Sequence, residues 1–485
     1  MDIYIIAIIF YVALLIGVGV YKSRAVKTQD DFMVAGRKTP TWMLVGTLIC
    51  TWIGSGSLFG GAGLAFRMGY SELWFSAGAW TGIAIVYFLA HKVRRISQYT
   101  ISDILEKRYN AVARIFGTSA VIIAYLTIAG YQFRGGGRLL NILTGIDPLW
   151  GGAITCAVTI LFTVFAGMVS IISLDIFNGI IMTLGVLIAL PLVVTAVGGM
   201  EQVATLPPDR FTIFGQYDAI WAMGVYFPTF FLLLGESSMY QKFFAAKDEH
   251  AARRAVIGMI IGVVVIETAL TALSVVGSSK YLTLAPFANP DGSLDKASTE
   301  TIILQLARFD LPQWAGVLLL CGGVAIILST ANTFLMIPST NITRDIYQRF
   351  INPEVSQETI VRFQRIWIVL LGVVAFVLAS FFKSIMDMAF TAYTMVGAGI
   401  TPALLAAFLW KRVTVAGGVA SIIAGMGVTV LITVLNMVLS EPLMETDYII
   451  LPAAGASLLC LFVVSWMTPP SPEEKWKPFM ENMAR

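Results

Sequence analysis

Long apolar stretches alternate with short polar connections along almost the whole chain. An α-helix needs about 20 apolar residues to cross the hydrocarbon core of a bilayer, so each stretch predicts one transmembrane helix. The first stretch begins at residue 2 with no basic leader and no small-residue cleavage site, and we expect it to be retained as a span. The pattern predicts thirteen spans, at residues 2–21, 41–66, 70–91, 113–134, 149–167, 170–197, 217–242, 254–277, 312–343, 364–382, 385–410, 414–437 and 447–468.

The basic residues of the connections predict the orientation of these spans. An odd number of spans places the two termini on opposite sides, and 24 of the 32 Lys and Arg residues then fall on one side and 8 on the other. Because basic loops stay in the cytoplasm, we expect the N-terminus outside and the C-terminus inside. This arrangement predicts a multi-pass protein of the plasma membrane, or of the inner membrane if the source is bacterial.

Composition supports a membrane protein and excludes several other classes. Hydrophobic residues make up 57% of the chain and charged residues 13%, whereas soluble domains carry about 25% charged residues. The net charge of +3 and the absence of a basic run with interleaved aromatics argue against nucleic-acid binding. The four cysteines lie in apolar segments without a CxxC spacing, and no nucleophile–His–acid set or phosphate loop is present. We therefore expect a membrane protein that is not an enzyme.

Two of the predicted spans are interrupted. The second carries five glycines between residues 54 and 63, and the seventh carries Pro228 followed by Gly-Glu-Ser-Ser at 235–238. Glycines also serve helix packing in membranes, so either interruption alone allows that simpler interpretation. The two interruptions, however, open blocks 41–197 and 217–410, each with five spans. Since five is odd, the second block must be inverted, which is the pattern of a secondary transporter with sites at mid-membrane.

The ninth span carries polar residues at its middle. Ser329, Asn332 and Thr333 share one helical face, with Thr330 beside them. Hydroxyls in a helix lie near the carbonyl three or four residues back, here that of Ile326. These hydroxyls could simply bond their own backbone or a neighbouring helix. Together with the carbonyl, they could instead offer several neutral oxygens to a small hard cation.

Three of the acids inside the predicted spans are candidates for a functional role. Asp175 could supply the charge that compensates a bound cation, or could form a hydrogen bond between helices. Glu236 could face a solute or pair locally with Lys242, and the structural and functional interpretations of Glu267 are equally open. If Glu236 and Glu267 both line a cavity, the site is acid-rich without an intramembrane Lys or Arg. Such a site favours an amine, polyamine, urea-like or zwitterionic solute over a monocarboxylate.

Six segments of the chain form a recognisable set: FGGAGLAFRMG, YTISDILEKRY at 99–109, YQFRGGGRLLNILTGI at 131–146, AGMVSIISLDIFNG at 166–179, YQKFFAAK at 240–247 and LSTANTFLMIPSTNITRDIY at 328–347. Through these segments the chain resembles the sodium:solute symporter family, which includes bacterial proline, galactose and sialic acid symporters. The resemblance extends over nearly the whole chain and implies an all-α, leucine-transporter-like fold. That fold has a five-plus-five inverted repeat with one extra N-terminal span and two extra C-terminal spans.

The resemblance also implies a sodium site. Its carbonyl ligands correspond to Cys50, Ile53 and Ile326, and its hydroxyl ligands to Ser329 and Thr330. The acid of the fifth core helix corresponds to Asp175, although Leu174 and Asn178 depart from the family's Thr-Asp-x-x-Gln context. Some members hold a second sodium at this acid, and the corresponding residues here are Asp175, Asn332 and Thr333. Because one hydroxyl is replaced by an amide, these residues serve either a second cation or coupling.

For the solute, the resemblance and the positions near the interruptions together give six candidates. The family's sugar and amino-acid symporters place solute contacts where Glu236 lies, and the galactose symporter has a solute-contacting lysine near the level of Glu267. Pro402, with the glycines at 397 and 399, is a candidate hinge. The candidate solute-binding residues are Ser55, Ser57, Glu236, Glu267, Tyr393 and Thr394.

The sequence thus predicts a sodium-coupled secondary active symporter that imports a small organic solute by alternating access. Its partners would be the solute, sodium and the lipid bilayer, without an obligate protein partner. A proton-coupled transporter using Asp175, Glu236 and Glu267 as a relay is the alternative. A transporter-like sensor is less favoured because no output element follows residue 485. We expect one transmembrane domain over 1–485, with extra spans 2–21, 414–437 and 447–468 and a cytoplasmic tail 469–485.

Overall fold

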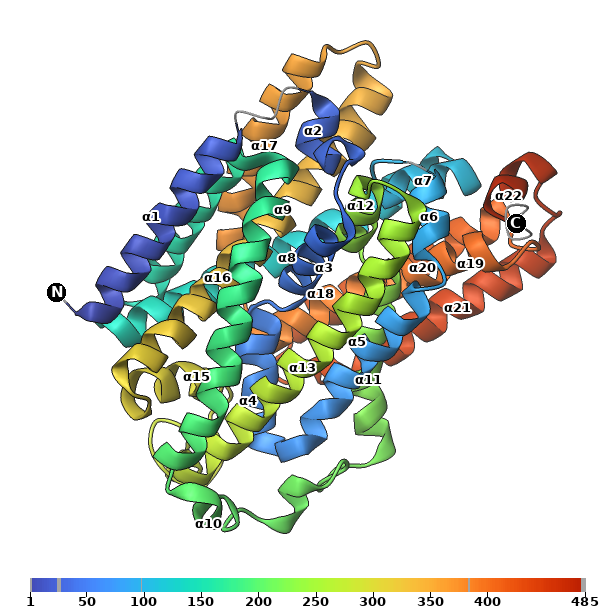
Figure 1. Ribbon diagram of the computed structural model, residues 1–485. Helices are drawn as coiled ribbons and strands as arrows, with labels where there is room; N and C mark the ends of the chain where they lie inside the picture. Colours follow the sequence, from blue (N-terminus) through green and yellow to red (C-terminus); the bar gives the residue numbers. More distant parts are fainter. Residues whose placement is uncertain (1, 24–27, 97, 383, 481–485) are drawn as a thin grey trace.

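The computed structural model describes residues 2–23, 28–96, 98–382 and 384–480. Every regular element within these ranges is a helix (Figure 1), so the predicted all-α class is confirmed. The long helices are α1 (Ile3–Ser23), α3 (Thr41–Trp52), α5 (Leu73–Val86), α8 (Ala111–Thr144), α9 (Pro148–Ala196), α11 (Ala219–Gly235), α13 (Glu249–Tyr281), α16 (Gln313–Asn341), α17 (Gln357–Ala379), α18 (Ile385–Gly399), α20 (Val415–Val438) and α21 (Ile450–Met467). The shorter ones are α2 (Gln29–Val34), α4 (Ala62–Met68), α6 (Ala90–Ile96), α7 (Ile101–Arg108), α10 (Gly199–Val203), α12 (Ser237–Ala245), α14 (Lys296–Thr299), α15 (Ile302–Gln305), α19 (Thr401–Leu409), α22 (Glu473–Met480) and the π-helical turns η2 (Gly56–Gly61) and η6 (Ile342–Ile351).

Side chains of the residues before the helices define where several of them begin. Asn110 accepts a hydrogen bond from the backbone N–H of Ala113 at the start of α8 (3.0 Å). Asp248 does the same for Ala251 at the start of α13 (2.6 Å). The first N–H groups of a helix have no partner within the helix, so such caps stabilise its start by about 1 kcal/mol.

Within the described residues, eleven helices are long and apolar enough to cross a membrane. A bent pair, Thr41–Trp52 with Gly56–Val86, turns by 52° and raises the number to twelve. The sequence assigned two spans, 41–66 and 70–91, to this pair. Gly69 ends α4 between them with a φ of +69°, a backbone conformation that glycine adopts without strain. A multi-pass membrane protein is thus confirmed, whereas the number thirteen stays a prediction.

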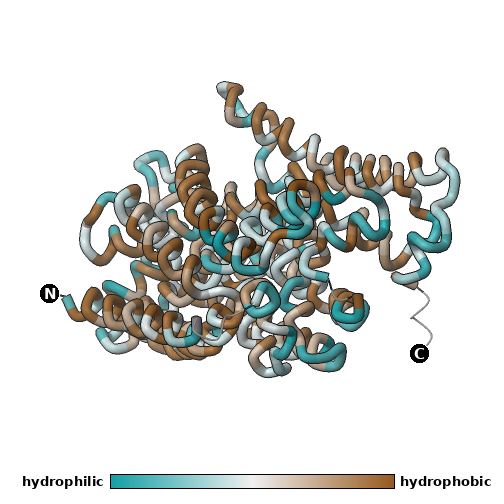
Figure 2. Tube along the Cα trace, turned by 90° about the horizontal axis from the view of Figure 1, so that it is seen from above, coloured by the Kyte–Doolittle hydropathy of each residue, from teal (hydrophilic) through white to brown (hydrophobic). Residues whose placement is uncertain are grey.

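The helices differ in how deeply they lie in the bundle. In the most apolar part of Gln313–Ile351, 83% of the residues are buried, against 28% in the corresponding parts of Ile3–Lys22 and Gly167–Ala196. The α16 helix therefore occupies the centre, where it packs along α8 and α9, while α1 and the second half of α9 present apolar side chains to the surroundings. Hydrophobic positions follow the helices over much of their length, and hydrophilic positions lie mostly in the connections (Figure 2).

Both predicted interruptions are confirmed. The α3 helix ends at Trp52, Ile53 has an extended backbone, and helical structure resumes with η2. The α11 helix ends at Gly235, Glu236 is extended, and α12 begins at Ser237. We call these the first break (residues 53–55) and the second break (residue 236).

Candidate sodium and solute sites

The first break meets the middle of α16. The hydroxyl of Thr330 lies 3.2 Å from the carbonyl oxygen of Cys50 and 3.3 Å from that of Ile53. The last carbonyls of a helix lack partners within it, which leaves the end of α3 free to present its oxygens to α16. Ile326 lies one turn before Thr330 on the same helix. Cys50, Ile53 and Thr330, three of the five predicted sodium ligands, therefore converge on one point.

Gly54 permits this close approach. A Cβ atom at residue 54 would lie 2.9 Å from Nε2 of Gln132 and 3.0 Å from Cγ2 of Thr330, closer than side chains pack without moving. Gln132, on α8, accepts a hydrogen bond from the backbone N–H of Ser55 (2.9 Å). The break is thus held between α8 and α16, with a glycine where no side chain fits.

The remaining hydroxyl ligand, Ser329, donates its hydrogen to the carboxylate of Asp175 on α9. Thr47 on α3 donates to the other oxygen of the same carboxylate. Both acid and serine are buried. The acid therefore lies directly behind a predicted sodium ligand, as a compensating charge would.

Lys242 corrects two expectations from the sequence. It was considered as a local partner of Glu236, and the acid-rich site was expected to lack an intramembrane Lys or Arg. In the structure its side chain is fully buried, its ammonium lies 3.8 Å from Asp175 and it donates a hydrogen bond to the carbonyl of Thr47 (2.9 Å). The reason is that α12 continues to Ala245, which keeps Lys242 inside the bundle. Its ion-pair partner is Asp175 and not the Glu236 that the local alternative offered.

Of the three residues predicted for a second cation or for coupling, two lie at one cavity and the third does not line it. Asp175 and Asn332 line one small cavity of about 10 Å³. The side-chain oxygen of Asn332 accepts a hydrogen bond from Thr163 (2.9 Å). Thr333 is buried, and its hydroxyl has no partner among the described residues.

Neutral donors surround Glu267 on α13. The indole N–H groups of Trp52 and Trp80 each donate to one of its carboxylate oxygens (2.7 Å each), and the hydroxyl of Ser57 lies 3.3 Å away. Glu267 and Ser57 also line a cavity of about 10 Å³ with Glu72, room for about one water molecule. The structure thus brings two predicted solute residues together beside the first break.

Tyr393 joins this group through aromatic contacts. Its ring centre lies 6.1 Å from that of Trp52, and its hydroxyl is 3.3 Å from that of Tyr131. A Cβ atom at Gly56 would lie 2.6 Å from the Tyr393 hydroxyl, so η2 passes directly beneath the ring edge. We call Trp52, Ser57, Glu267 and Tyr393 the solute cluster.

The other three candidates occupy different surroundings. Glu236 accepts a hydrogen bond from Ser238, two residues further along α12. The hydroxyls of Ser55 and Thr394 are buried without a partner among the described residues. Near the candidate hinge, α18 ends at Gly399 and α19 begins at Thr401, so the tenth core helix is interrupted at Ile400.

Known proteins are similar to this chain in sequence and in architecture. The model of the sodium:solute symporter family matches residues 32–425. The chain belongs to this family. It is 26% identical to the osmoregulated proline transporter OpuE of Bacillus subtilis (strain 168), over 95% of this chain and 94% of the relative. It is 23% identical to the sodium/proline symporter of Staphylococcus aureus (strain JH9), over 96% and 92%.

Among solved structures, a Na⁺-coupled sialic acid symporter in a substrate-bound outward-open state has a TM-score of 0.80 at 17% identity, covering 97% of this chain and 99% of the other. Mhp1, a nucleobase-cation-symport-1 family transporter, has a TM-score of 0.57 at 10% identity, covering 92% and 97%. These likenesses show a leucine-transporter-type fold. Since the family and the relatives are transporters, the prediction of a transporter and not an enzyme is confirmed.

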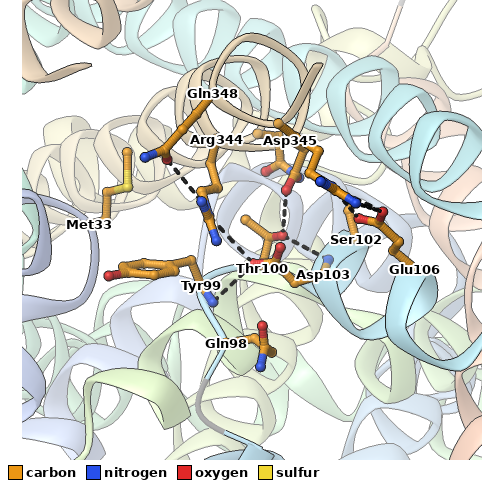
Figure 3. A network of polar contacts seen from close by, with 12 residues as sticks. Met33, Gln98, Tyr99, Thr100, Ser102, Asp103, Glu106, Arg344, Asp345 and Gln348 are labelled. Carbon is orange, nitrogen blue, oxygen red and sulfur yellow. Dashed lines mark hydrogen bonds and ion pairs between the residues drawn. The ribbon is translucent and has the colours of Figure 1, made fainter. Parts of the chain in front are cut away.

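The symporter also carries a polar network where two of the family-like segments meet. Thr100, from the segment 99–109, donates to Asp345, from the segment 328–347 (2.9 Å). Arg344 lies 3.9 Å from Asp103 and donates to Gln348 (2.9 Å), as Figure 3 shows. This network joins α7 to η6 at the end of the bundle where α2 and α12 also lie, here called the α7 end.

Sequence reasoning missed several residues of the symporter's sites. Thr47, Trp52, Gln132 and Trp80 were not singled out, although Gln132 stands in the quoted segment 131–146. Their roles depend on which helices face each other, and spacing along one helix does not give that information. A polar residue in an otherwise apolar span was the available signal for Gln132 and Thr47.

Proposed function

We propose that this symporter binds a sodium ion between the first break and the middle of α16. The carbonyls of Cys50, Ile53 and Ile326 and the hydroxyls of Ser329 and Thr330 would be its ligands. The observation that carries the proposal is the position of Thr330, whose hydroxyl is within 3.3 Å of two carbonyls freed by the end of α3. Sodium prefers such hard oxygens, and neutral ligands let it bind and leave.

The ion would act by alternating access. A sodium ion between α3 and α16 would replace the hydrogen bonds of Thr330 and stabilise the arrangement in which the two helices meet. Because the solute cluster begins at Trp52, directly beside the ligand Ile53, the same arrangement would order the solute site. By linkage, sodium then raises the affinity for the solute, and the solute raises that for sodium.

The solute we propose is a small molecule with an amine, taken up as a cation or zwitterion. Glu267 would receive the amine, because the described residues around it offer only neutral hydrogen-bond donors. Tyr393 and Trp52 would cover its apolar part, with Ser57 as a polar contact. Glu236, Ser55 and Thr394 remain proposed contacts of the same pathway. The proline named for both relatives is a zwitterion of this class.

We further propose thirteen spans with an inverted repeat, and the α7 end in the cytoplasm. The bent pair then counts as two spans, and Lys and Arg concentrate at the α7 end, as the positive-inside rule requires. The C-terminus would lie in the cytoplasm and the N-terminus outside.

A thermal-shift screen of the purified protein, with and without sodium, tests the solute class. Amino acids and polyamines should raise the melting temperature more in sodium than in potassium, while sugars, nucleobases and monocarboxylates should not. Glu267→Gln should abolish the rise in melting temperature caused by amines and keep the rise caused by sodium without a solute. Glu358→Gln, at the start of α17, should change neither rise. Tight binding of a monocarboxylate without response to amines would contradict the charge argument.

Uptake into proteoliposomes decides the coupling ion. With a solute from the screen, an inward sodium gradient should drive accumulation and a proton gradient of equal size should not. Accumulation driven by protons alone would favour the relay of Asp175, Glu236 and Glu267 instead.

A further inference from the structure

Lys242 occupies the position that a second cation would need. Its ammonium is held by a carboxylate oxygen of Asp175 (3.8 Å) and the backbone carbonyl of Thr47 (2.9 Å). Carboxylate and carbonyl oxygens are also the ligands that hard cations prefer. The side chain reaches this point from α12, on the far side of the second break, and no part of it is exposed.

The charge of Asp175 is therefore already matched within the protein. A carboxylate buried in the bundle is costly unless a positive charge accompanies it, and the Lys242 ammonium provides that charge from within the chain. An additional sodium at Asp175 would lie close to the ammonium and would be repelled by it.

The oxygens around Asp175 are also committed. Its two carboxylate oxygens accept hydrogen bonds from Ser329 and Thr47, and the amide oxygen of Asn332 accepts one from Thr163. The cavity that Asp175 shares with Asn332 is otherwise lined by apolar side chains, apart from Asn178, whose oxygen accepts a hydrogen bond from Tyr11 (2.6 Å). This cavity offers too few free oxygens to replace the hydration shell of sodium.

We infer that Lys242 is a tethered cation that takes the place of a second sodium at Asp175, so that the transporter binds one sodium ion per chain. This inference rests on the proposed sodium site at Ser329 and Thr330. Asp175 connects the two: Ser329 donates to one of its oxygens, and Lys242 faces the other. The pair thus positions a sodium ligand and contributes no ion of its own to the transport cycle.

Equilibrium binding of ²²Na⁺ to the purified full-length protein tests the inference without a known solute. The wild type should saturate near one sodium per chain. In Lys242→Gln the carboxylate loses its cation, while the carbonyl of Thr47 and the introduced amide oxygen become available, and binding should rise to about two per chain. Lys242→Arg keeps the charge and should stay at one.

Two further variants control for changes unrelated to the pair. Lys247→Gln removes a lysine that is largely exposed and lies 3.9 Å from Asp248, and it should bind one sodium. The double variant Asp175→Asn with Lys242→Gln removes both charges and should return to one. Size-exclusion profiles establish that each variant is folded.

Each outcome has a distinct meaning. Two sodium ions per wild-type chain would overturn the inference, as would a folded Lys242→Gln that still binds one. If Lys242→Gln does not fold, the wild-type value and the neutral double variant still decide the number of ions. No sodium binding by the wild type would overturn the proposed function itself.

Discussion

The first and second breaks look alike in sequence and differ in what their freed backbone groups contact. The first break follows the end of α3, and its free groups are carbonyls, two of which face Thr330. The second break lies between the end of α11 and the start of α12. There the carbonyl of Leu234 accepts a hydrogen bond from the Tyr240 hydroxyl (2.8 Å), and the N–H of Ser238 donates to the hydroxyl of Tyr125 (3.1 Å). Helix C-termini carry partial negative charge and N-termini partial positive charge. The first break, whose freed carbonyls face a hydroxyl on α16, therefore suits a cation better than the second.

The acids near the two breaks also differ in what stabilises their charge. Glu236 stands at the start of α12, where the helix dipole and the Ser238 hydroxyl both favour a carboxylate. Asp175 is not at a helix terminus, and its charge is met by Lys242 from another helix. A buried acid beside a helix start can thus have a local structural cause, whereas Asp175 depends on the way that four helices come together.

The largest expected effect comes from removing oxygens at the first break. Thr330→Ala and Ser329→Ala should each lower the apparent sodium affinity roughly ten- to a hundredfold, since an interaction with a charged partner contributes about 1.5–3 kcal/mol. Sodium titrations followed by thermal shift or ²²Na⁺ binding measure this change.

Thr127→Ala is the matched control for these variants. Thr127 is also a buried threonine, but its hydroxyl donates to the carbonyl of Ile123 in its own helix (2.9 Å), so sodium affinity should not change. Wild-type affinity in both Ser329→Ala and Thr330→Ala would reject the site assignment.

An intermediate effect is expected from crowding the first break. Gly54→Ala would place a Cβ atom against Gln132 and Thr330, and such overpacking costs about 1–3 kcal/mol. We expect sodium affinity to fall roughly tenfold, because the carbonyls must move away from α16.

Gly427→Ala provides the comparison, because a Cβ atom there has nothing within 4 Å. It should change neither sodium affinity nor melting temperature. If Gly54→Ala behaves like Gly427→Ala, the first break has more freedom than its contacts indicate.

The sequence predicted the elements better than their partners. Apolar length gave the membrane spans and glycine clustering gave the first break, because both are local properties of the chain. The third span was the exception: α5 covers only Leu73–Val86, and the residues before it form short helical turns that bend at Gly69. Hydropathy averaged over the length of a span does not register so short a turn.

For the sites, the residues on α16 were predicted because their spacing placed them on one face. Lys242 ends the predicted span 217–242, since a basic residue at the end of an apolar stretch normally marks the membrane boundary. Its burial depends on Asp175 on α9, 67 positions earlier in the chain, and the two meet because α12 and α9 both pack against α3. Pairings of this kind arise from tertiary structure and leave no local signal.

The smallest effect on sodium should come from the second break. Tyr125→Phe removes the hydroxyl that accepts a hydrogen bond from Ser238 but keeps the ring that packs on Phe334, 4.6 Å between ring centres. Leaving that buried N–H without a partner should lower stability by about 1–3 kcal/mol, visible as a lower melting temperature. Sodium affinity should change less than about threefold, because the freed group is a donor and cannot ligate a cation. A tenfold loss of sodium affinity would contradict the division between the breaks and show that the second break also serves the ion.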